Sequence, residues 1–201
     1  NLKNEHVRGQ IHFVGNIMID TLEMFSKKAK HIAKEKKYYF CTLHRAENVD
    51  DKKVFSEIVP ALEIIAKGAV IHLPLHPRTR IMANQFKLLD RLKRACNLLP
   101  PLSYSKSVSY MKNASLILTD SGGVQEEASF LGVPCLTLRT ETERPITVTQ
   151  GTNIVAGVTK ESILKAYSKV NFKKRKTNIK YWDGKTSKRI ASILKNKLQA
   201  K

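Results

Sequence analysis

Four polar segments of the chain carry residue types that suit the binding and departure of a phosphate group. They are residues 44–48, 76–78, 120–123 and 139–144, and each follows directly after a short apolar run. Histidine can transfer a proton near neutral pH, arginine binds phosphate oxygens, and glycine lets the backbone approach a ligand closely. Together these residue types favour the binding of a diphosphate.

The Asp-Ser-Gly-Gly run at 120–123 stands between an apolar run and a helical pattern. Unpaired N–H groups in the first turn of that helix would form an anion site. The run is neither a G-x-G-x-x-G motif nor a Walker loop, so no dinucleotide or ATP motif is inferred. Glu126 and Glu127 follow, where a carboxylate either complements the helix dipole or accepts the two hydroxyl hydrogens of a diol such as ribose.

Two histidines follow predicted strands. His44, beside Arg45, could protonate or neutralise a departing phosphate oxygen, although a lone histidine is more often structural. Arg45 could instead pair with Glu47. His76 could contact an anion, whereas His72 is expected in the core.

Arg144 offers a second arginine for the same ligand. It could reach a phosphate or a sugar, or it could form a salt bridge with Glu141 or Glu143. No set of cysteines or histidines has the spacing of metal ligands, so no metal site is predicted.

The elements that position these segments alternate along the chain. Apolar runs predict strands at 38–43, 70–75, 97–99, 115–119, 135–138 and 153–156. Helical periodicity predicts helices at 17–32, 54–65, 80–94, 105–113, 124–131, 161–169 and 187–198. The alternation predicts right-handed βαβ units, and therefore an α/β fold with a Rossmann-like, doubly wound parallel sheet. Ligands bind beyond the carboxyl ends of such strands, where the four polar segments fall.

Length and composition set further limits. The 201 residues suit a single domain, 1–201, and no apolar run is long enough to span a membrane. Lys and Arg number 36 against 17 Asp and Glu, which gives a formal charge of +19. That charge invites a nucleic-acid hypothesis, but arginine is sparse and many lysines fall on predicted helices, where they would be solvated. Three scattered cysteines suit reduced thiols in the cytoplasm. We therefore expect neither a nucleic-acid nor a membrane partner.

Several motifs taken together resemble one family. Thr-Asp-Ser-Gly-Gly-Val-Gln-Glu-Glu-Ala at 119–128 and Thr-Glu-Arg-Pro at 142–145 resemble the non-hydrolysing UDP-N-acetylglucosamine 2-epimerases. Val-Gly-Asn at 14–16, His-Arg-Ala-Glu-Asn at 44–48 and Asp-Gly at 183–184 fit the same family. Its members have two Rossmann-like halves, as in glycosyltransferase B-type folds. This chain resembles the C-terminal, nucleotide-binding half along nearly its whole length.

The resemblance implies roles for individual residues. His44 would lie beside the departing diphosphate and act in catalysis, and His76 would belong to a regulatory substrate site. The backbone at Leu102 would contact uracil, and Glu127 would bind the ribose hydroxyls. The full set implied to bind the UDP-sugar is Arg45, Leu102, Ser121, Gly122, Gly123, Glu127 and Arg144. Ser107 stands where the family often has a phenylalanine near uracil.

The resemblance also implies a reaction and partners. UDP-N-acetylglucosamine and UDP-N-acetylmannosamine would interconvert by elimination and re-addition of UDP, without a cofactor, as a step of polysaccharide biosynthesis. The acid and base groups lie in the family's N-terminal half, so this chain alone is expected to be inactive. Expected partners are the UDP-sugar, the N-terminal domain of the same enzyme and, at full length, a second copy. The final helix, 187–198, would pack towards that N-terminal domain.

Two other functions fit parts of the sequence. The donor-binding half of a UDP-sugar glycosyltransferase would share the fold and the nucleotide, but the motifs at 44–48 and 142–145 favour the epimerase. A basic, non-enzymatic module that binds nucleic acid would explain the charge. The lack of a basic aromatic patch counts against it.

Overall fold

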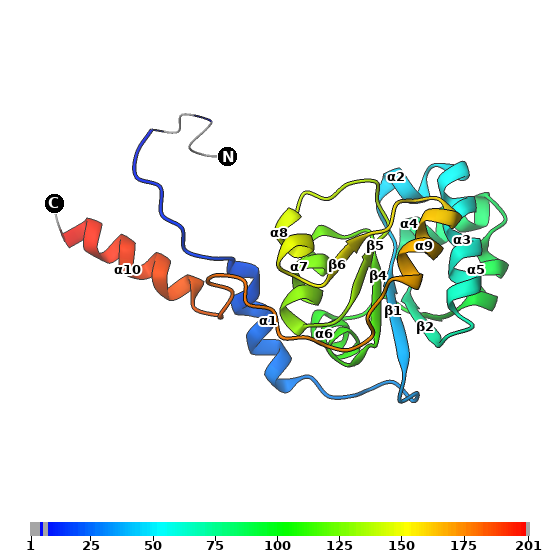
Figure 1. The fold of residues 1–201 in the computed structure, drawn as a ribbon, viewed down its shortest axis with the longest axis horizontal. Helices are drawn as coiled ribbons and strands as arrows, with labels where there is room; N and C mark the ends of the chain where they lie inside the picture. Colours follow the sequence, from blue (N-terminus) through cyan, green and yellow to red (C-terminus); the bar gives the residue numbers. More distant parts are fainter. Residues whose placement is uncertain (1–4, 6–7, 200–201) are drawn as a thin grey trace.

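A six-stranded parallel sheet forms the centre of the computed structural model, which describes residue 5 and residues 8–199 (Figure 1). Its strands are β1 (Tyr38–Thr42), β2 (Val70–Pro74), β3 (Cys96–Leu99), β4 (Leu116–Thr119), β5 (Cys135–Thr137) and β6 (Asn153–Val155). The strand order is β3-β2-β1-β4-β5-β6, and every neighbouring pair is parallel. The order reverses between β1 and β4, which confirms the doubly wound sheet.

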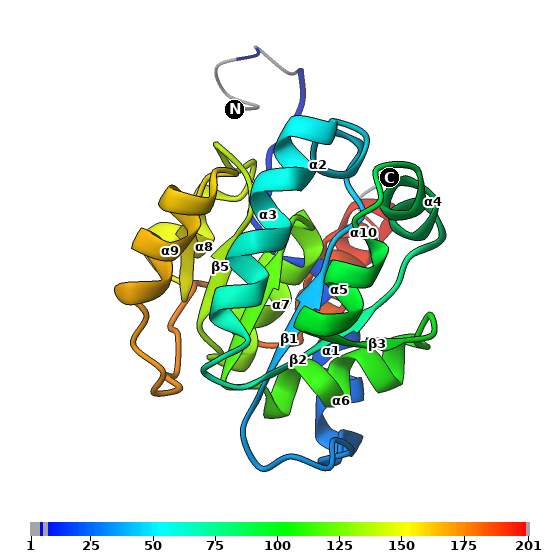
Figure 2. The ribbon, with the colours of Figure 1, turned by 90° about the vertical axis from the view of Figure 1, so that its right-hand side faces the viewer.

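Helices cover both faces of this sheet (Figure 2). They are α1 (Ile17–Lys28), α2 (Ala46–Val49), α3 (Lys52–Ile65), α4 (Pro77–Gln85), α5 (Leu89–Ala95), α6 (Tyr104–Asn113), α7 (Gly122–Leu131), α8 (Pro145–Thr149), α9 (Lys160–Ser168) and α10 (Thr186–Gln199). Helices α3, α5 and α9 pack together on one face, and α1, α6 and α7 pack on the other.

The central strands are buried on both faces, as their unbroken apolar sequences require. Tyr39 and Leu118 point into the core under α3, while Phe40 and Ile117 point into the core under α6 and α7. The three free cysteines are also buried, and burial raises the pKa of Cys135 to about 12. They therefore pack as small apolar side chains.

Two predicted helices have different bounds in the structure. The predicted helix 80–94 is two helices, α4 and α5, because the chain turns between them through Lys87, whose φ is 58°. Helix α1 ends at Lys28 rather than near Ile32. Ile32 is 43 % exposed, so continuing the helix would bury no further apolar surface there.

Helix α10 extends away from the sheet beside the N-terminal segment (Figure 1). Its first turn is held by α1, because Asp20 accepts the backbone N–H groups of Thr186 at 3.0 Å and Ser187 at 2.7 Å. Asp183, which precedes the helix, pairs with Arg189. Among the described residues, no helix has both the length and the apolar character needed to cross a bilayer.

Candidate functional site

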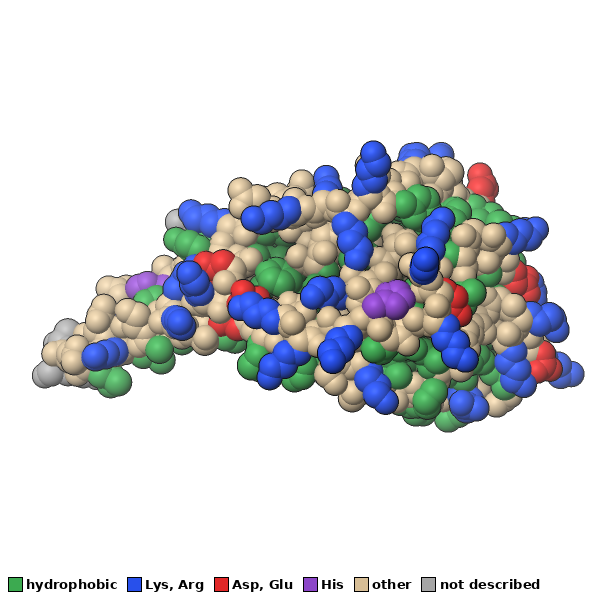
Figure 3. Space-filling view, turned by 90° about the horizontal axis from the view of Figure 1, so that it is seen from below, with side chains coloured by type: hydrophobic (Ala, Val, Ile, Leu, Met, Phe, Trp, Pro, Cys, Tyr) green, Lys and Arg blue, Asp and Glu red, His purple; other side chains and the backbone are tan. Residues whose placement is uncertain are grey.

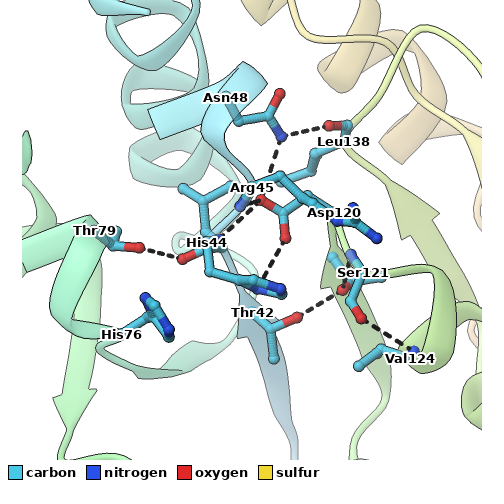
Figure 4. A network of polar contacts seen from close by, with 12 residues as sticks. Thr42, His44, Arg45, Asn48, His76, Thr79, Asp120, Ser121, Val124 and Leu138 are labelled. Atoms are coloured by element: carbon cyan, nitrogen blue, oxygen red, sulfur yellow. Dashed lines mark hydrogen bonds and ion pairs between the residues drawn. The ribbon is translucent and has the colours of Figure 1, made fainter. Parts of the chain in front are cut away.

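The carboxyl ends of β1 and β4 bring His44 and Asp120 together (Figure 4). His44 Nδ1 lies 3.3 Å from Asp120 Oδ1. The other carboxylate oxygen, Oδ2, accepts the backbone N–H of His44 at 2.9 Å and that of Arg45 at 2.8 Å. One carboxylate therefore holds the loop that carries His44 and also lies close to its ring.

Asp120 is fully buried, and desolvation raises its pKa despite the hydrogen bonds that it accepts. Asn48 supports it from α2, donating to Asp120 Oδ2 at 3.5 Å and to the carbonyl oxygen of Leu138 at 2.8 Å. The His44 side chain is 37 % exposed. The pair therefore joins a buried anchor to an imidazole that a ligand can reach.

Helix α7 begins directly beside this pair. Ser121 caps the helix by accepting the N–H of Val124, and its own N–H is held by Thr119 Oγ1 at 3.0 Å. Gly122 and Gly123 form the first turn, whose N–H groups have no acceptors within the helix. A Cβ atom at either glycine would meet no atom closer than 3.9 Å. The backbone at this turn is therefore open to a ligand, and the anion site stays a prediction.

Arg144 lies against the start of α7. A Cβ atom at Gly122 would be 3.9 Å from its Nε atom, and that atom is 3.1 Å from Glu126 Oε1. The ion pairs considered with Glu141 and Glu143 are wrong, because Arg144 reaches Glu143 only through the carbonyl oxygen, at 3.2 Å from Nη1. The guanidinium is thus held at the helix N-terminus.

Arg45 does not pair with Glu47. Arg139 takes that carboxylate, with its Nε atom 2.7 Å from Glu47 Oε1. Within residues 8–199 the Nε atom of Arg45 is buried without a hydrogen-bond partner. The Arg45 side chain as a whole is only partly buried.

Glu127 lies on the inner side of α7 and is 5 % exposed. Burial raises the pKa of this carboxyl, while the hydroxyl of Tyr104, which donates to Oε1 at 2.8 Å, opposes that rise. Tyr104 therefore holds the carboxylate in place from α6. Burial also raises the pKa of the Tyr104 hydroxyl above its usual range.

A cavity of about 220 Å³ opens between β1, β2 and α6. It brings together His44, His76, Leu102 and Ser107, which are separate in the sequence. Its lining is Phe40, Thr42, Leu43, His44, Pro74, His76, Pro101, Leu102, Ser107 and Val124. Mostly apolar walls with a few polar groups are typical of a site for a flat ring.

His76 lies beside His44, with 5.5 Å between the ring centroids. Its Nδ1 atom accepts the N–H of Arg78 at 3.2 Å and so caps α4. Arg78 is held by both carboxylate oxygens of Asp50, so it does not point to the site as a free cation. His72 is buried, as expected, and contacts Glu35 at 2.9 Å.

The sequence assigned no individual role to Asp120, Asn48, Tyr104 or Gln125, although all but Tyr104 lie within the motifs named above. Gln125 Oε1 accepts from Thr142 at 2.6 Å and so ties the loop before α8 to α7. Only Asp120 carried a usable signal, since a charged residue directly after an apolar strand must find buried partners.

Comparison with known proteins identifies relatives of this arrangement. A family model described as UDP-N-acetylglucosamine 2-epimerase matches residues 1–195. A UDP-N-acetylglucosamine 2-epimerase homolog of Methanococcus maripaludis is 41 % identical over 98 % of this chain and 57 % of its own length. A UDP-2,3-diacetamido-2,3-dideoxy-D-glucuronate 2-epimerase of Pseudomonas aeruginosa is 37 % identical over 96 % of this chain and 56 % of its own length. The chain thus spans about half the length of the curated relatives it matches.

Solved structures of other proteins also resemble this chain. The Methanocaldococcus jannaschii UDP-GlcNAc 2-epimerase, crystallised with UDP-GlcNAc and UDP, superposes with a TM-score of 0.88 at 39 % identity. The match covers 97 % of this chain and 57 % of that one. An Escherichia coli heptosyltransferase shares the fold alone, at 15 % identity and a TM-score of 0.53 over 73 % of this chain and 48 % of its own. The sheet therefore matches half of a glycosyltransferase B-type architecture.

Proposed function

The chain belongs to the UDP-N-acetylglucosamine 2-epimerase family, and we propose that it is the UDP-binding half of such an enzyme. One observation carries the proposal. His44, the first turn of α7 and Arg144 converge at the carboxyl edge of a sheet that superposes on an epimerase crystallised with UDP-GlcNAc and UDP. Convergence of these groups on one edge is what recognition of a nucleotide diphosphate needs.

In this proposal the diphosphate binds at the start of α7. The N–H groups of Gly122 and Gly123 and the hydroxyl of Ser121 contact phosphate oxygens, and Arg144 adds a positive charge from the side. Arg45 supplies a further donor next to His44. The site is prepared before the ligand arrives, because Asp120, Gln125 and the helix itself already fix these groups.

The nucleoside would extend from there to the cavity beside α6. Glu127 accepts hydrogen bonds from the ribose hydroxyls, and uracil enters the cavity and meets the backbone at Leu102. Ser107 lines the same cavity, so a small polar side chain faces the base.

The reaction inverts the sugar at C2. A base removes the C2 proton while the bond between C1 and the diphosphate oxygen breaks, giving a glycal and UDP. UDP then adds again to C1 as C2 takes a proton on its other face. The charge that develops on the leaving diphosphate falls beside His44 and the α7 N-terminus, which stabilise it.

We place the remaining catalytic groups outside this sequence. Within the described residues, Asp120 and Glu127 are already engaged, so neither serves as the base at C2. We therefore assign the acid and base carboxylates to the half of the relatives that the chain does not span. This chain alone should bind UDP weakly and should not turn over, and the whole enzyme should act as a homodimer.

The decisive experiment uses the whole enzyme with UDP-GlcNAc. Proton NMR should show the formation of UDP-ManNAc, and His44→Asn should lower kcat about 100-fold or more. His31→Asn, on the opposite edge of the sheet, is the matched control and should leave kcat within twofold. Transfer of the sugar to an acceptor without interconversion would contradict the proposal and favour a glycosyltransferase. Turnover by the 201-residue chain alone would contradict the assignment of the catalytic carboxylates.

A further inference from the structure

The positive charge of the chain is not spread evenly over the fold. The loops that enter the strands, at 29–37 and 66–69, and the segment 169–176 after α9 hold ten Lys or Arg and one Glu. The loops that leave the strands, where the candidate site lies, hold three Arg and three Asp or Glu. Solvation of lysines on helix faces would not produce this difference between the two edges of one sheet.

We call the three segments 29–37, 66–69 and 169–176 the basic edge. Figure 3 looks onto this side of the molecule and shows lysines and arginines spread across it, with apolar side chains between them. Lys37 lies over the ring of Phe172, 5.5 Å from its centroid, so the first and third segments touch. Lys174 donates to the carbonyl oxygen of Lys112, and Lys112 donates to that of Ser26, which continues the surface across α6 to α1.

Structural roles account for little of this charge. Within residues 8–199, no lysine of the basic edge forms an ion pair with a carboxylate. Glu35, the one acidic residue there, contacts His72 instead. A helix dipole acts only within the last turn, so it does not explain Lys34, Lys36 or Lys173.

The chemistry of the basic edge favours a diffuse anionic surface over a nucleic acid. Nine of its ten cations are lysines, and its single arginine, Arg175, already donates to the carbonyl oxygen of Gly151. No free guanidinium fork is therefore offered to a phosphate or a base. Ile32 is 43 % exposed and Phe172 is 38 % exposed, each within a lysine-rich segment. Apolar side chains among lysines are typical of surfaces that rest on lipid headgroups.

We propose that the basic edge docks the protein reversibly onto a bilayer that contains anionic lipids. Lysines would contact the headgroups, while Ile32 and Phe172 enter the interface. The candidate site lies on the opposite edge of the sheet, so docking leaves it open to a nucleotide-sugar. This departs from the expectation, drawn from the sequence, that no membrane partner exists.

Vesicle sedimentation tests the proposal with the 201-residue chain. The chain should sediment with vesicles of 30 % phosphatidylglycerol in phosphatidylcholine at 50 mM salt, and stay in solution with pure phosphatidylcholine. Raising the salt to 300 mM should release it, because screening weakens charge attraction at a surface. The triple variant Lys34→Glu, Lys36→Glu, Lys173→Glu should lower the partition coefficient at least about tenfold.

The control variant changes the net charge by the same amount but outside the basic edge. Lys52→Glu, Lys53→Glu and Lys188→Glu lie outside the basic edge on exposed positions of α3 and α10, and should keep binding within twofold. Equal loss in both triple variants would overturn the proposal, since net charge alone would then explain binding. Equal binding to both vesicle types would also overturn it. So would tighter binding to a 20-nucleotide RNA than to the vesicles at 150 mM salt, which would identify a nucleic-acid surface instead.

Discussion

Asp120 and His44 are 76 residues apart in the chain, yet one carboxylate oxygen of Asp120 lies 3.3 Å from the imidazole of His44 while the other holds the backbone N–H of the same residue. A side chain that binds both the ring and the backbone of a histidine leaves that histidine little freedom to turn. The ring then presents its Nε2 atom away from Asp120. In the proposed function, that atom would contact the leaving diphosphate.

Asp120→Asn should therefore damage catalysis more than binding. The amide oxygen can still accept the backbone N–H groups. The NH₂ group, which is a donor, then faces His44 Nδ1 in place of a carboxylate oxygen. We expect kcat of the whole enzyme to fall about tenfold or more, with KM for UDP-GlcNAc within about twofold.

Nitrogen NMR of His44 separates this role from a merely structural one, because the variant should change the tautomer of the ring. Asp50→Asn, at the end of α2, is the control and should leave both kcat and the tautomer unchanged. A loss confined to KM, or an unchanged tautomer, would contradict the positioning role.

Gly123→Ala should separate folding from ligand binding. A Cβ atom there would meet nothing closer than Ser121 Oγ at 3.9 Å, and alanine favours the helix by about 0.5–1 kcal/mol over glycine. We expect the melting temperature to stay or rise, while the affinity for UDP, measured by calorimetry, falls about tenfold. Unchanged affinity would mean that the diphosphate does not approach this backbone.

Tyr104→Phe should make UDP binding more sensitive to acid. Burial raises the pKa of Glu127, and loss of the Tyr104 hydrogen bond should raise that pKa further. Only the carboxylate can accept both ribose hydroxyls, so affinity should fall as pH decreases through this raised pKa, and should fall at a higher pH in the variant. Calorimetry between pH 5 and pH 8 measures the difference.

The titration of UDP itself is common to both proteins and cancels in that comparison. Tyr167→Phe, which removes a hydroxyl that contacts only Tyr39 on the far side of the sheet, is the matched control. If the two variants have the same pH dependence, Glu127 is not the group that binds ribose.

Asp20→Ala should loosen α10 without affecting the sheet. Burial opposes ionisation of Asp20, but hydrogen bonds from Ser187 and Thr186 outweigh it and lower its pKa. Its contribution is therefore present above its ordinary pKa and is lost as pH falls through the lowered value. We expect the free energy of opening of α10, measured by hydrogen exchange at neutral pH, to fall by about 1 kcal/mol. Asp183→Ala should change hydrogen exchange in α10 less than Asp20→Ala does. Equal changes would contradict the role of Asp20 in holding the first turn of α10.

The sheet was predictable from the sequence because its central strands are buried on both faces. An unbroken run such as Leu116–Thr119 reads as a buried strand without knowledge of its neighbours. The break between α4 and α5 was not predictable, because no signal in the local sequence marks it. Lys87 takes a positive φ to let Leu88 and Leu92 reach the core, a requirement of packing rather than of its own residue type.

The positions of the site residues were also predictable, since polar segments after parallel strands must share one edge. The ion pairs that these residues form were not predictable. Spacing left open a pair between Arg45 and Glu47, but the sheet places Arg139 against Glu47. Likewise, Arg144 pairs with the carboxylate of Glu126 on α7 rather than with those of Glu141 or Glu143. Partners of this kind depend on strand order, which local sequence does not contain.

The reversal of strand order between β1 and β4 has a consequence for how the protein folds. β1 and β2 pair through one local βαβ unit, whereas β1 and β4 pair across two intervening strands and their helices, a longer-range contact that we expect to form later. The carboxylate of Asp120 acquires its partners from the β1 side at that same late step. Competence to bind a nucleotide should therefore arise with the last long-range pairing, so that nucleotide binding reports on completed folding rather than on any earlier, partly structured state.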